Sequence, residues 1–345
     1  MEVRLAFIGF GNVARSFARI LTARADQLDE EYGLHCKTTA IATGTHGCVT
    51  SHDGIDLIEA VACIERGGQL TDLAGCEPAG DSLAVLNQCE ADVLFETTPL
   101  DINSGEPAIT HIRTALARGL HVVTANKGPI AFSYSELKTL AKHHGVQFRF
   151  EGTVMDGTPV FNLVERCLPG TRVLGFSGVL NSTTNLILTG MESGQSFEES
   201  LAEAQRRGIA EANADYDIDG WDAAVKAVAL ANVLMNAEAR PADVKRSGIR
   251  GISMKDVEVA AASGNVIRLV ARAEQSANGI GLVVRPELVP CASVFGSLGG
   301  TSNALVIKTD LMGEIAVVEN DPGVEQTAYA LLSDLISVHK ALQHT

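Results

Sequence analysis

Gly9-Phe10-Gly11-Asn12-Val13-Ala14 is a glycine-rich turn between an apolar run at residues 3–8 and an amphipathic segment at about 12–25. The apolar run predicts a buried strand, and the amphipathic segment predicts a helix. Glycines in such a turn let backbone N–H groups approach a pyrophosphate at the N-terminus of the helix. The turn therefore predicts a dinucleotide site that contains Gly9, Phe10, Gly11, Asn12 and Val13.

The rest of the first half alternates short apolar runs with amphipathic segments. This alternation is typical of βαβ units, in which parallel strands are connected by helices on the faces of the sheet. We predict an α/β fold, a doubly wound parallel (Rossmann) sheet, in a first domain at residues 1–150. The further strands expected are at 38–43, 91–95, 121–124 and 146–150, and the further helices at 55–65, 107–117 and 134–144.

After residue 150 the pattern changes to longer helices followed by alternating runs. This pattern predicts a second, α+β domain at residues 151–322. We expect the C-terminal segment 323–345 to form a helix that returns to the first domain. The helices expected in the second domain are at 183–191, 197–207 and 222–235, and the strands at 266–273, 279–284, 304–308 and 314–318.

Composition and charge exclude several classes of protein. The chain has 345 residues, of which 46% are hydrophobic, and a formal net charge of -15. Such a charge repels nucleic acid and anionic lipid, so neither is an expected partner. The seven cysteines form no Cys-x-x-Cys pair, and no apolar stretch reaches the roughly 18 residues of a membrane span. We expect a soluble protein of the reducing cytoplasm.

The residues after the second predicted strand bear on the choice of cofactor. An Asp or Glu at this point would bond the ribose hydroxyls and select NAD. This chain has Thr43-Gly44-Thr45-His46-Gly47 instead. Without a carboxylate there is no repulsion of a 2′-phosphate, which Thr43, Thr45 and His46 could contact. NADP is therefore favoured, and NAD stays open because no arginine completes the pocket.

Two polar turns follow the predicted strands at 91–95 and 121–124. They are Glu96-Thr97-Thr98-Pro99 and Thr124-Ala125-Asn126-Lys127-Gly128-Pro129. A doubly wound sheet binds its ligand beyond the carboxyl ends of its strands. Thr97, Thr98 and Lys127 are therefore candidate ligands of the cofactor, although a lysine in a turn can also be merely solvated.

A group of charged residues in the second half has the composition of a proton-transfer site. Asp222 and Lys226 are one helical turn apart, and Glu211 and Asp217 precede them. Removing hydride from a carbinol leaves a hydroxyl proton, and an amine among carboxylates is a suitable partner for it. The alternative is an ordinary surface pair beside an acidic, solvated loop.

Four motifs occur in an order that resembles homoserine dehydrogenase, in a short form that lacks a regulatory ACT module. The resemblance runs from about residue 3 to at least residue 230. It implies interconversion of L-homoserine and L-aspartate 4-semialdehyde with NAD(P), in amino-acid biosynthesis, and no feedback inhibition is expected. The motifs are Thr124-Ala-Asn-Lys127-Gly-Pro129, Glu151-Gly-Thr-Val154, Gly178-Val-Leu-Asn-Ser-Thr-Thr-Asn185 and the pattern from Glu211 to Lys226.

The resemblance also implies roles for individual residues. Lys226 would donate and accept the proton, and Lys127 would help to place substrate and cofactor. Glu211, Asp217 and Asp222 would bind the amino and hydroxyl groups of homoserine or orient Lys226. Gly208 and Gly300 would join the cofactor site. The second domain would bind the substrate and form a homodimer.

The turn after residue 150 resembles a site for a monovalent cation such as sodium. Its ligands would be Glu151 and backbone atoms of Val154, Asp156 and Thr158, since oxygen donors suit hard cations.

The chain departs from the family at Asn213-Ala214, where Asp-Pro is usual, and at Asp156, an extra carboxylate. Two alternatives therefore stay open: a dehydrogenase of a related hydroxy or amino acid, and a non-catalytic dinucleotide-binding sensor.

Overall fold

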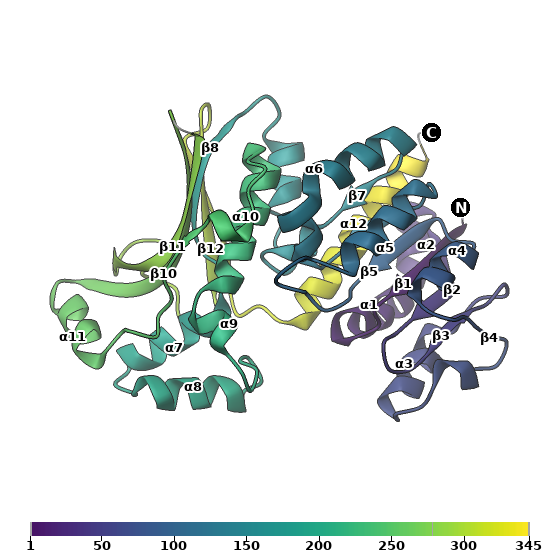
Figure 1. Cartoon of the computed structure of the whole chain (residues 1–345), viewed down its shortest axis with the longest axis horizontal. Helices are drawn as coiled ribbons and strands as arrows, with labels where there is room; N and C mark the ends of the chain where they lie inside the picture. Colours follow the sequence, from purple (N-terminus) through teal and green to yellow (C-terminus); the bar gives the residue numbers. More distant parts are fainter. Residues whose placement is uncertain (1, 278, 344–345) are drawn as a thin grey trace. The chain divides into compact units, whose positions relative to one another are not determined.

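The computed structural model describes residues 2–277 and 279–343 and divides the chain into two compact units (Figure 1). Unit 1 contains Met1–Thr158 and Gly323–Thr345, and unit 2 contains Pro159–Pro322. The division therefore falls after Thr158, beyond the expected boundary at residue 150.

Residues 151–158 belong to unit 1 because they are bonded to the C-terminal helix α12 (Val324–Leu342). The Glu151 amide donates a hydrogen bond of 2.9 Å to Asp334 Oδ2. Thr327 Oγ1 donates one of 2.7 Å to Asp156 Oδ1. The hydrophobic pattern marks the end of a strand near 150 but carries no information about these long-range contacts.

The sheet of unit 1 is the predicted doubly wound parallel sheet. Its seven strands lie in the order β4-β3-β2-β1-β5-β6-β7, and the pairs that join β2, β1, β5, β6 and β7 are parallel. The short strands β3 and β4, which pair antiparallel at one edge, were not among the predicted strands. The strand bounds are β1 Glu2–Ile8, β2 His35–Ala42, β3 Cys48–Thr50, β4 Glu77–Pro78, β5 Val93–Glu96, β6 His121–Thr124 and β7 Phe148–Arg149.

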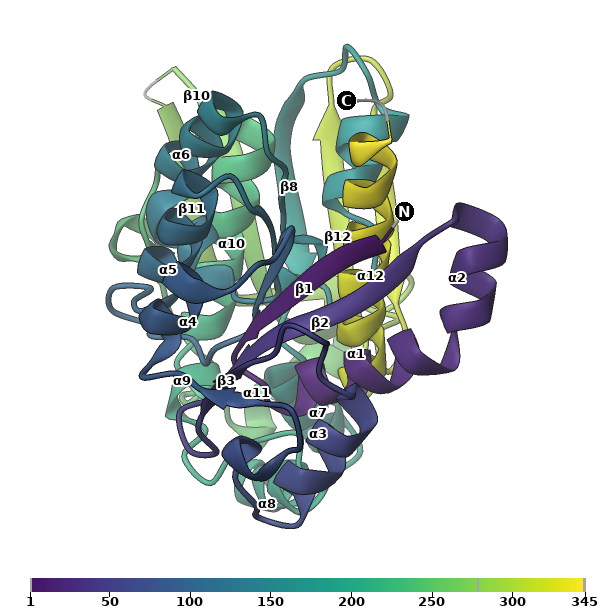
Figure 2. The ribbon, with the colours of Figure 1, turned by 90° about the vertical axis from the view of Figure 1, so that its right-hand side faces the viewer.

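Alternating side chains of β1 enter two separate cores, one on each face of this sheet. Phe7 packs in the core that also holds Phe17 and Leu331, from α1 and α12, whereas Ile8 packs in the core that holds Ile112. Helices therefore cover both faces, and α12 lies along α1 (Figure 2). The helices are α1 Asn12–Ala23, α2 Ala25–Tyr32, α3 Leu57–Glu65, α4 Ser82–Gln88, α5 Ala108–Ala117, α6 Lys127–His144 and α12.

Two helices of unit 1 differ from the prediction. The helix expected at 12–25 ends at Ala23, and a second helix begins at Ala25. The helix expected at 134–144 begins at Lys127, with a kink at Ser133, so it starts directly after β6. This earlier start places Lys127 in the first turn of α6 and not in a free loop.

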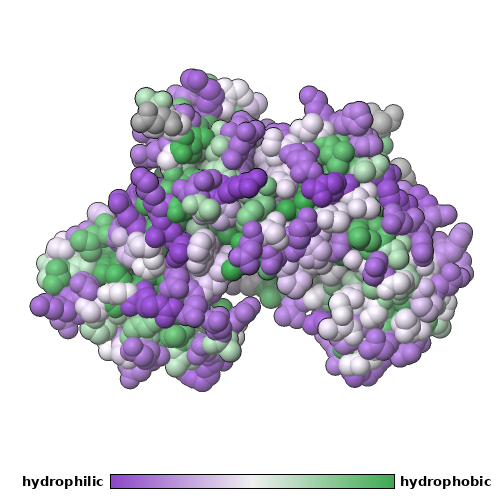
Figure 3. All heavy atoms as spheres, viewed as in Figure 1, coloured by the Kyte–Doolittle hydropathy of each residue, from purple (hydrophilic) through white to green (hydrophobic). Residues whose placement is uncertain are grey.

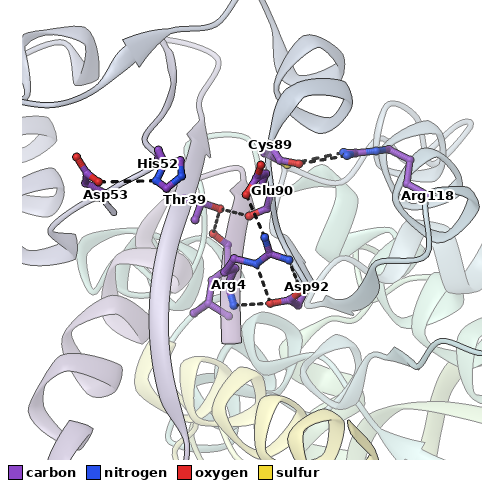
Figure 4. Close-up of polar contacts among 9 residues, drawn as sticks. Arg4, Thr39, His52, Asp53, Cys89, Glu90, Asp92 and Arg118 are labelled. Carbon is purple, nitrogen blue, oxygen red and sulfur yellow. Dashed lines mark hydrogen bonds and ion pairs between the residues drawn. The ribbon is translucent and has the colours of Figure 1, made fainter. Parts of the chain in front are cut away.

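At the amino end of β5 a polar network joins neighbouring strands (Figure 4). Arg4 on β1 bonds Asp92 through its backbone N, over 2.8 Å, and through Nη2, over 2.9 Å. Thr39 Oγ1 on β2 donates to the Glu90 carbonyl over 2.9 Å, and Arg118 Nη2 donates to the Cys89 carbonyl over 3.1 Å. This network links β1 and β2 to the segment before β5, at the end of the strands opposite the polar turns.

Unit 2 contains a six-stranded sheet in the order β13-β12-β8-β10-β11-β9. Its pairs are antiparallel except for β11 with β9, so the unit is α+β as predicted. The strands are β8 Val173–Val179, β9 Lys245–Arg246, β10 Asn265–Ser276, β11 Gly279–Pro290, β12 Asn303–Thr309 and β13 Glu314–Glu319, and the helices are α7 Ser182–Glu192, α8 Phe197–Arg206, α9 Asp215–Ile218, α10 Trp221–Met235 and α11 Met254–Ala262.

Helix α10 is buried along most of its length, and it packs on β8, β10 and β11. Its N-cap residue Gly220 has a φ of 79°, a conformation that glycine adopts without steric cost. The first two turns of α10 carry Asp222 and Lys226, so the packing of this helix against the sheet fixes both side chains relative to β8.

Hydrophilic residues cover much of the visible face, and apolar residues gather there in small groups (Figure 3). Within residues 2–277 and 279–343, no helix is both long enough and apolar enough to cross a membrane.

Candidate active site

The glycine-rich turn connects β1 directly to α1, as the fingerprint requires. Gly9 has a φ of 86°, and a Cβ atom there would lie 2.6 Å from the carbonyl carbon of Thr97. Its amide donates to the Ala42 carbonyl over 2.9 Å, and its own carbonyl accepts a bond of 2.8 Å from Thr97 Oγ1. Only glycine fits this position, where the ends of β1, β2 and β5 meet.

The loop after β2 is held by its own hydrogen bonds. Thr43 Oγ1 donates to the Gly47 carbonyl over 3.0 Å and accepts from the His46 amide over 2.7 Å. His46 Nδ1 lies 2.8 Å from the carbonyl oxygen of Gly68. Both side chains are half-buried beside the glycine-rich turn, and residues 43–47 contain no carboxylate.

The polar turns after β5 and β6 are joined through a buried residue, Glu96. Its carboxylate accepts hydrogen bonds from the backbone and hydroxyl of Thr98, the former over 3.0 Å, and from Thr124 Oγ1 over 2.9 Å. Burial raises the pKa of Glu96 to about 7, while the hydrogen bonds from Thr98 and Thr124 oppose the rise. The sequence indicated this turn but gave no role to Glu96.

Lys127 is the first residue of α6. The preceding residue, Asn126, caps the helix by accepting a bond of 2.9 Å from the Gly128 amide. Asn126 also donates from Nδ2 to the Thr98 carbonyl over 3.0 Å. Lys127, whose side chain is half-buried, therefore begins α6 next to a residue that is bonded to the turn after β5.

In unit 2, Asn181 brings two of the predicted carboxylates together. Its Nδ2 atom donates to Asp217 Oδ1 over 2.7 Å and to Asp222 Oδ2 over 2.9 Å. Its Oδ1 atom caps α7 by accepting a bond of 2.8 Å from the Thr184 amide. Because the cap fixes the orientation of the amide group, it also fixes the direction in which Nδ2 points.

Lys226 lies against the same group. Its Nζ atom is 3.5 Å from Asp222 Oδ2 and donates a hydrogen bond of 2.7 Å to the Leu180 carbonyl. Both Asp222 and Lys226 are mostly buried, with side-chain exposures of 9% and 15%. The arrangement is therefore a desolvated cluster and not the surface pair that was the alternative interpretation.

The electrostatics of this cluster are dominated by burial and like charge. Burial and the neighbouring carboxylate of Asp222 raise the pKa of Asp217, whereas hydrogen bonds from Asn181 and Thr183 oppose the rise. Burial also raises the pKa of Tyr216, with a further contribution from Asp222 and Asp217. The cluster therefore favours binding of a positively charged group.

Glu211 is not part of this hydrogen-bonded cluster. It is exposed in the loop before α9, and its carbonyl accepts a bond of 3.3 Å from Gln205 Nε2. In the same loop Asn213, one of the departures from the family pattern, accepts at Oδ1 from the Asp215 amide over 3.0 Å. Asn213 is thus bonded to Asp215, the first residue of α9, the short helix that carries Asp217.

Ion pairs hold the outer side of this loop. Arg250 bonds both Asp215 and Asp219, the latter over 3.0 Å, so it spans the residues on either side of Asp217. The guanidinium of Arg246 lies 3.8 Å above the ring of Trp221.

The two remaining glycines expected near the cofactor occupy left-handed turns. Gly208 has a φ of 70° and is exposed just after α8, whereas Gly300 has a φ of 60°. The Gly300 carbonyl accepts a bond of 3.2 Å from Asn185 Nδ2, which connects this glycine to α7.

The turn expected to hold a cation follows β7 along the chain and belongs to unit 1. Glu151 and Val154 are buried, and Asp156 has a φ of 43° with its carboxylate bonded to Thr327. The Thr158 amide bonds the Met155 carbonyl over 2.8 Å. The turn is rich in oxygen atoms, which fits a hard cation. In the described part of the chain, no group of three or more His, Cys, Asp and Glu side chains could hold a metal ion.

Comparison with known protein families decides what the two units are. A family model described as "Homoserine dehydrogenase, NAD binding domain" matches residues 9–151, and one described as "Homoserine dehydrogenase" matches residues 159–336. The chain belongs to the homoserine dehydrogenase family. As a homoserine dehydrogenase it interconverts L-homoserine and L-aspartate 4-semialdehyde by hydride transfer with a nicotinamide dinucleotide, so the predicted enzyme class is confirmed.

Individual homoserine dehydrogenases align over nearly the full chain. The "NAD(+)-dependent homoserine dehydrogenase" of Pseudomonas canavaninivorans is 37% identical to this chain. The alignment covers 97% of that protein and 99% of this chain. The homoserine dehydrogenase of Methanocaldococcus jannaschii is 38% identical, with 98% of each chain covered. A solved structure described as a hyperthermophilic archaeal homoserine dehydrogenase in complex with NADPH is 28% identical to this chain, with a TM-score of 0.83. The match covers 98% of each of the two chains.

Several polar groups near the site of this homoserine dehydrogenase were not predicted from the sequence. Asn181 and the Leu180 carbonyl lie within the third motif, but an Asn before a helix is also an ordinary N-cap. Tyr216, whose buried hydroxyl has no hydrogen-bond partner among the described residues, directly precedes Asp217. Glu96 directly precedes Thr97. The available signal was adjacency to a predicted site residue.

Proposed function

We propose that Lys226 carries the proton in the homoserine dehydrogenase reaction. A bound nicotinamide would supply the hydride to the aldehyde carbon, and the Lys226 ammonium would donate a proton to the aldehyde oxygen, so that an alcohol forms. In the reverse direction the amine takes the hydroxyl proton as hydride leaves the carbinol carbon. The observation that carries this assignment is the contact of Lys226 with Leu180 and Asp222 in a buried cluster.

Asp217 and Asp222 are proposed to bind the substrate ammonium group. Two neighbouring carboxylates, held by one amide of Asn181, provide the negative charge that an ammonium group requires. Asp222 also orients Lys226. Glu211 is proposed to bind the substrate from the exposed loop, and its contribution is expected to be smaller because water screens an exposed charge.

The proposed dinucleotide site of unit 1 consists of residues at the carboxyl ends of β1, β2, β5 and β6. Gly208 and Gly300 of unit 2 are proposed as further cofactor ligands because the family resemblance implies it. Phe10, Gly11, Asn12 and Val13 provide the turn and the start of α1 for the pyrophosphate. Lys127 is proposed to help to place both the substrate and the cofactor.

NADP is proposed as the preferred cofactor and NAD as the alternative. The absence of a carboxylate in residues 43–47 supports NADP, since a 2′-phosphate meets no acidic side chain of that loop. The ratio of kcat/KM for the two cofactors tests the preference. A higher value for NAD would reverse it.

Three further proposals concern the cation, the assembly and the compartment. A monovalent cation bound at Glu151, Val154, Asp156 and Thr158 would have a structural role. The test compares the thermal stability of the protein in sodium or potassium chloride with its stability in the chloride of a larger cation at equal ionic strength. A homodimer through unit 2 is proposed because the family resemblance implies it. Light scattering tests the dimer. A cytoplasmic enzyme is supported by seven free cysteines and is tested by cell fractionation.

The experiment that tests the activity is a spectrophotometric assay at 340 nm with homoserine, each cofactor and a small panel of other hydroxy acids. We expect homoserine to be the best substrate. A better hydroxy acid would favour the related dehydrogenase to which Asn213-Ala214 pointed, and no absorbance change with any substrate would favour a non-catalytic sensor.

A further inference from the structure

Glu96 is a buried carboxyl group that no step of the reaction uses. It is 0% exposed at the end of β5, and its neighbours across the sheet are Ile8 on β1 and Thr124 on β6. Burial is the largest influence on its pKa, and only hydrogen bonds from Thr98 and Thr124 oppose it. Burying a carboxyl group without a cationic neighbour costs free energy, so stability alone does not account for a glutamate here.

The hydrogen bonds around Glu96 form a closed ring. Thr98 donates to one carboxylate oxygen through its amide and its hydroxyl, and Thr124 donates to the other. Asn126 completes the ring. Its backbone N–H donates to Thr124 Oγ1 over 3.0 Å, and its side-chain Nδ2 donates to the Thr98 carbonyl over 3.0 Å. The ring therefore joins the ends of β5 and β6.

The hydrogen bonds of this ring match the ionised form of Glu96. Both oxygens of Glu96 act as acceptors, and Thr124 Oγ1 already accepts from Asn126, so its hydroxyl hydrogen is directed to Glu96. A glutamine presents one acceptor and one donor group. Glutamine would therefore leave either Thr98 or Thr124 without its acceptor.

The ring extends to the turns that face the cofactor in the proposed function. On one side Thr97 Oγ1, next to the ring, bonds the carbonyl of Gly9. On the other side Asn126 caps α6 at Gly128, and Lys127 lies between these two residues. A change at Glu96 is thus transmitted through hydrogen bonds to both turns.

We propose that Glu96 is a positioning residue for the nicotinamide dinucleotide, which holds the Thr97-Thr98 turn and Lys127 in the arrangement that binds the cofactor. Glu96 does not touch the cofactor itself. This proposal rests on the proposed cofactor site. Because the ring arranges the binding turns and supplies no reacting group, its loss should weaken cofactor binding more than it slows turnover at saturating cofactor.

The first test compares Glu96→Gln with Glu90→Gln, which makes the same substitution at an exposed glutamate that precedes β5 and pairs with Arg4. NADH and NADPH binding is measured by fluorescence titration, and kcat and KM are measured with homoserine. Loss of one hydrogen bond to a charged group predicts a roughly tenfold or larger rise in the cofactor dissociation constant for Glu96→Gln. The kcat value at saturating cofactor should change by less than about threefold, within about 0.7 kcal/mol. Glu90→Gln should bind both cofactors as the native enzyme does.

A second pair of variants keeps the proposal testable if Glu96→Gln does not fold. Thr124→Ser retains the hydroxyl of the ring, and Thr124→Val replaces it with a methyl group of similar volume. Weaker cofactor binding by the valine variant, with native binding by the serine variant, supports the positioning role. Native binding by both Glu96→Gln and Thr124→Val overturns it.

Lys127→Ala separates this failure from a failure of the proposed cofactor site. If this variant binds cofactor more weakly while Thr124→Val does not, the site stands and the role of Glu96 is wrong. If all of these variants bind as the native enzyme does, both proposals are wrong.

Discussion

Lys226 Nζ donates a 2.7 Å hydrogen bond to the carbonyl oxygen of Leu180, at the junction between β8 and α7. A lysine amine has no fixed direction on its flexible stem, so a rigid carbonyl is an effective anchor for it. Asp222, one helical turn before Lys226, provides the second contact. The residue proposed to transfer the proton is thereby held by two contacts.

Replacing Lys226 with alanine should abolish proton transfer while cofactor binding remains. We expect kcat to fall by about 10²-fold to 10⁴-fold, the range for loss of a general acid or base. Steady-state assays at 340 nm measure kcat, and fluorescence titration measures the cofactor dissociation constant. The control is Lys245→Ala, an exposed lysine on β9. Turnover near that of the native enzyme in Lys226→Ala would assign the proton to another group.

Asn181→Asp tests the amide that holds Asp217 and Asp222. An aspartate retains the oxygen that caps α7, because Asp caps helices as well as Asn does. It removes the donor to both carboxylates and adds a third negative charge beside them. We expect KM for homoserine to rise by about tenfold or more, as loss of a hydrogen bond to a charged group predicts.

Asn181→Ser separates the loss of the bridge from the added charge, since serine also caps a helix and is neutral. KM should rise less in this variant than in Asn181→Asp. Equal KM values for both variants and the native enzyme would remove the bridge from substrate binding.

The affinity for homoserine should depend on pH through Asp217. Burial and the Asp222 carboxylate raise the pKa of Asp217, so its negative charge is lost at a higher pH than for an ordinary aspartate. The ionised form attracts the substrate ammonium, and KM should therefore fall as pH rises through that pKa. Asp217→Asn should have a higher KM with a weaker pH dependence. A native KM that does not change with pH on the acidic side would contradict this assignment.

The local parts of the fold and site were predictable, and the long-range parts were not. The β1-turn-α1 segment and the spacing of Asp222 and Lys226 are visible as periodicity within a few residues. Strand β8 was missed because Gly175 and Gly178 interrupt its apolar alternation. The bond from Lys226 to Leu180 depends on that strand, so no sequence pattern indicated it.

Glu211 illustrates the opposite case. Its spacing from Asp217 and Asp222 suggested convergence, yet its side chain lies outside their cluster in an exposed loop. Spacing along a loop fixes no direction for a side chain, whereas spacing along a helix does.

Glu96 should make the stability of unit 1 fall as pH rises. Burial raises its pKa from the ordinary 4.5 to about 7, so between these values the folded state binds more protons than the unfolded state. The stabilisation is complete below the lower value and is lost as pH rises through the upper one, in total on the order of 3 kcal/mol.

Thermal midpoints of native enzyme and Glu96→Gln between pH 5 and pH 8.5 test this linkage, with Glu90→Gln as the control. The midpoint of the variant relative to that of the native enzyme should rise with pH, because glutamine does not ionise. A constant difference would indicate that Glu96 titrates normally.

Tyr216→Phe should leave the folded protein as stable as before or make it more stable. The Tyr216 hydroxyl is buried, and it has no hydrogen-bond partner among residues 2–277 and 279–343. An unpaired buried hydroxyl costs about 1 kcal/mol or more, so its removal relieves a cost and breaks no bond of the free enzyme. The thermal midpoint should therefore stay or rise, and Tyr329→Phe, at an exposed tyrosine on α12, should be neutral. A clear drop in the midpoint for Tyr216→Phe would mean that the hydroxyl is satisfied in solution.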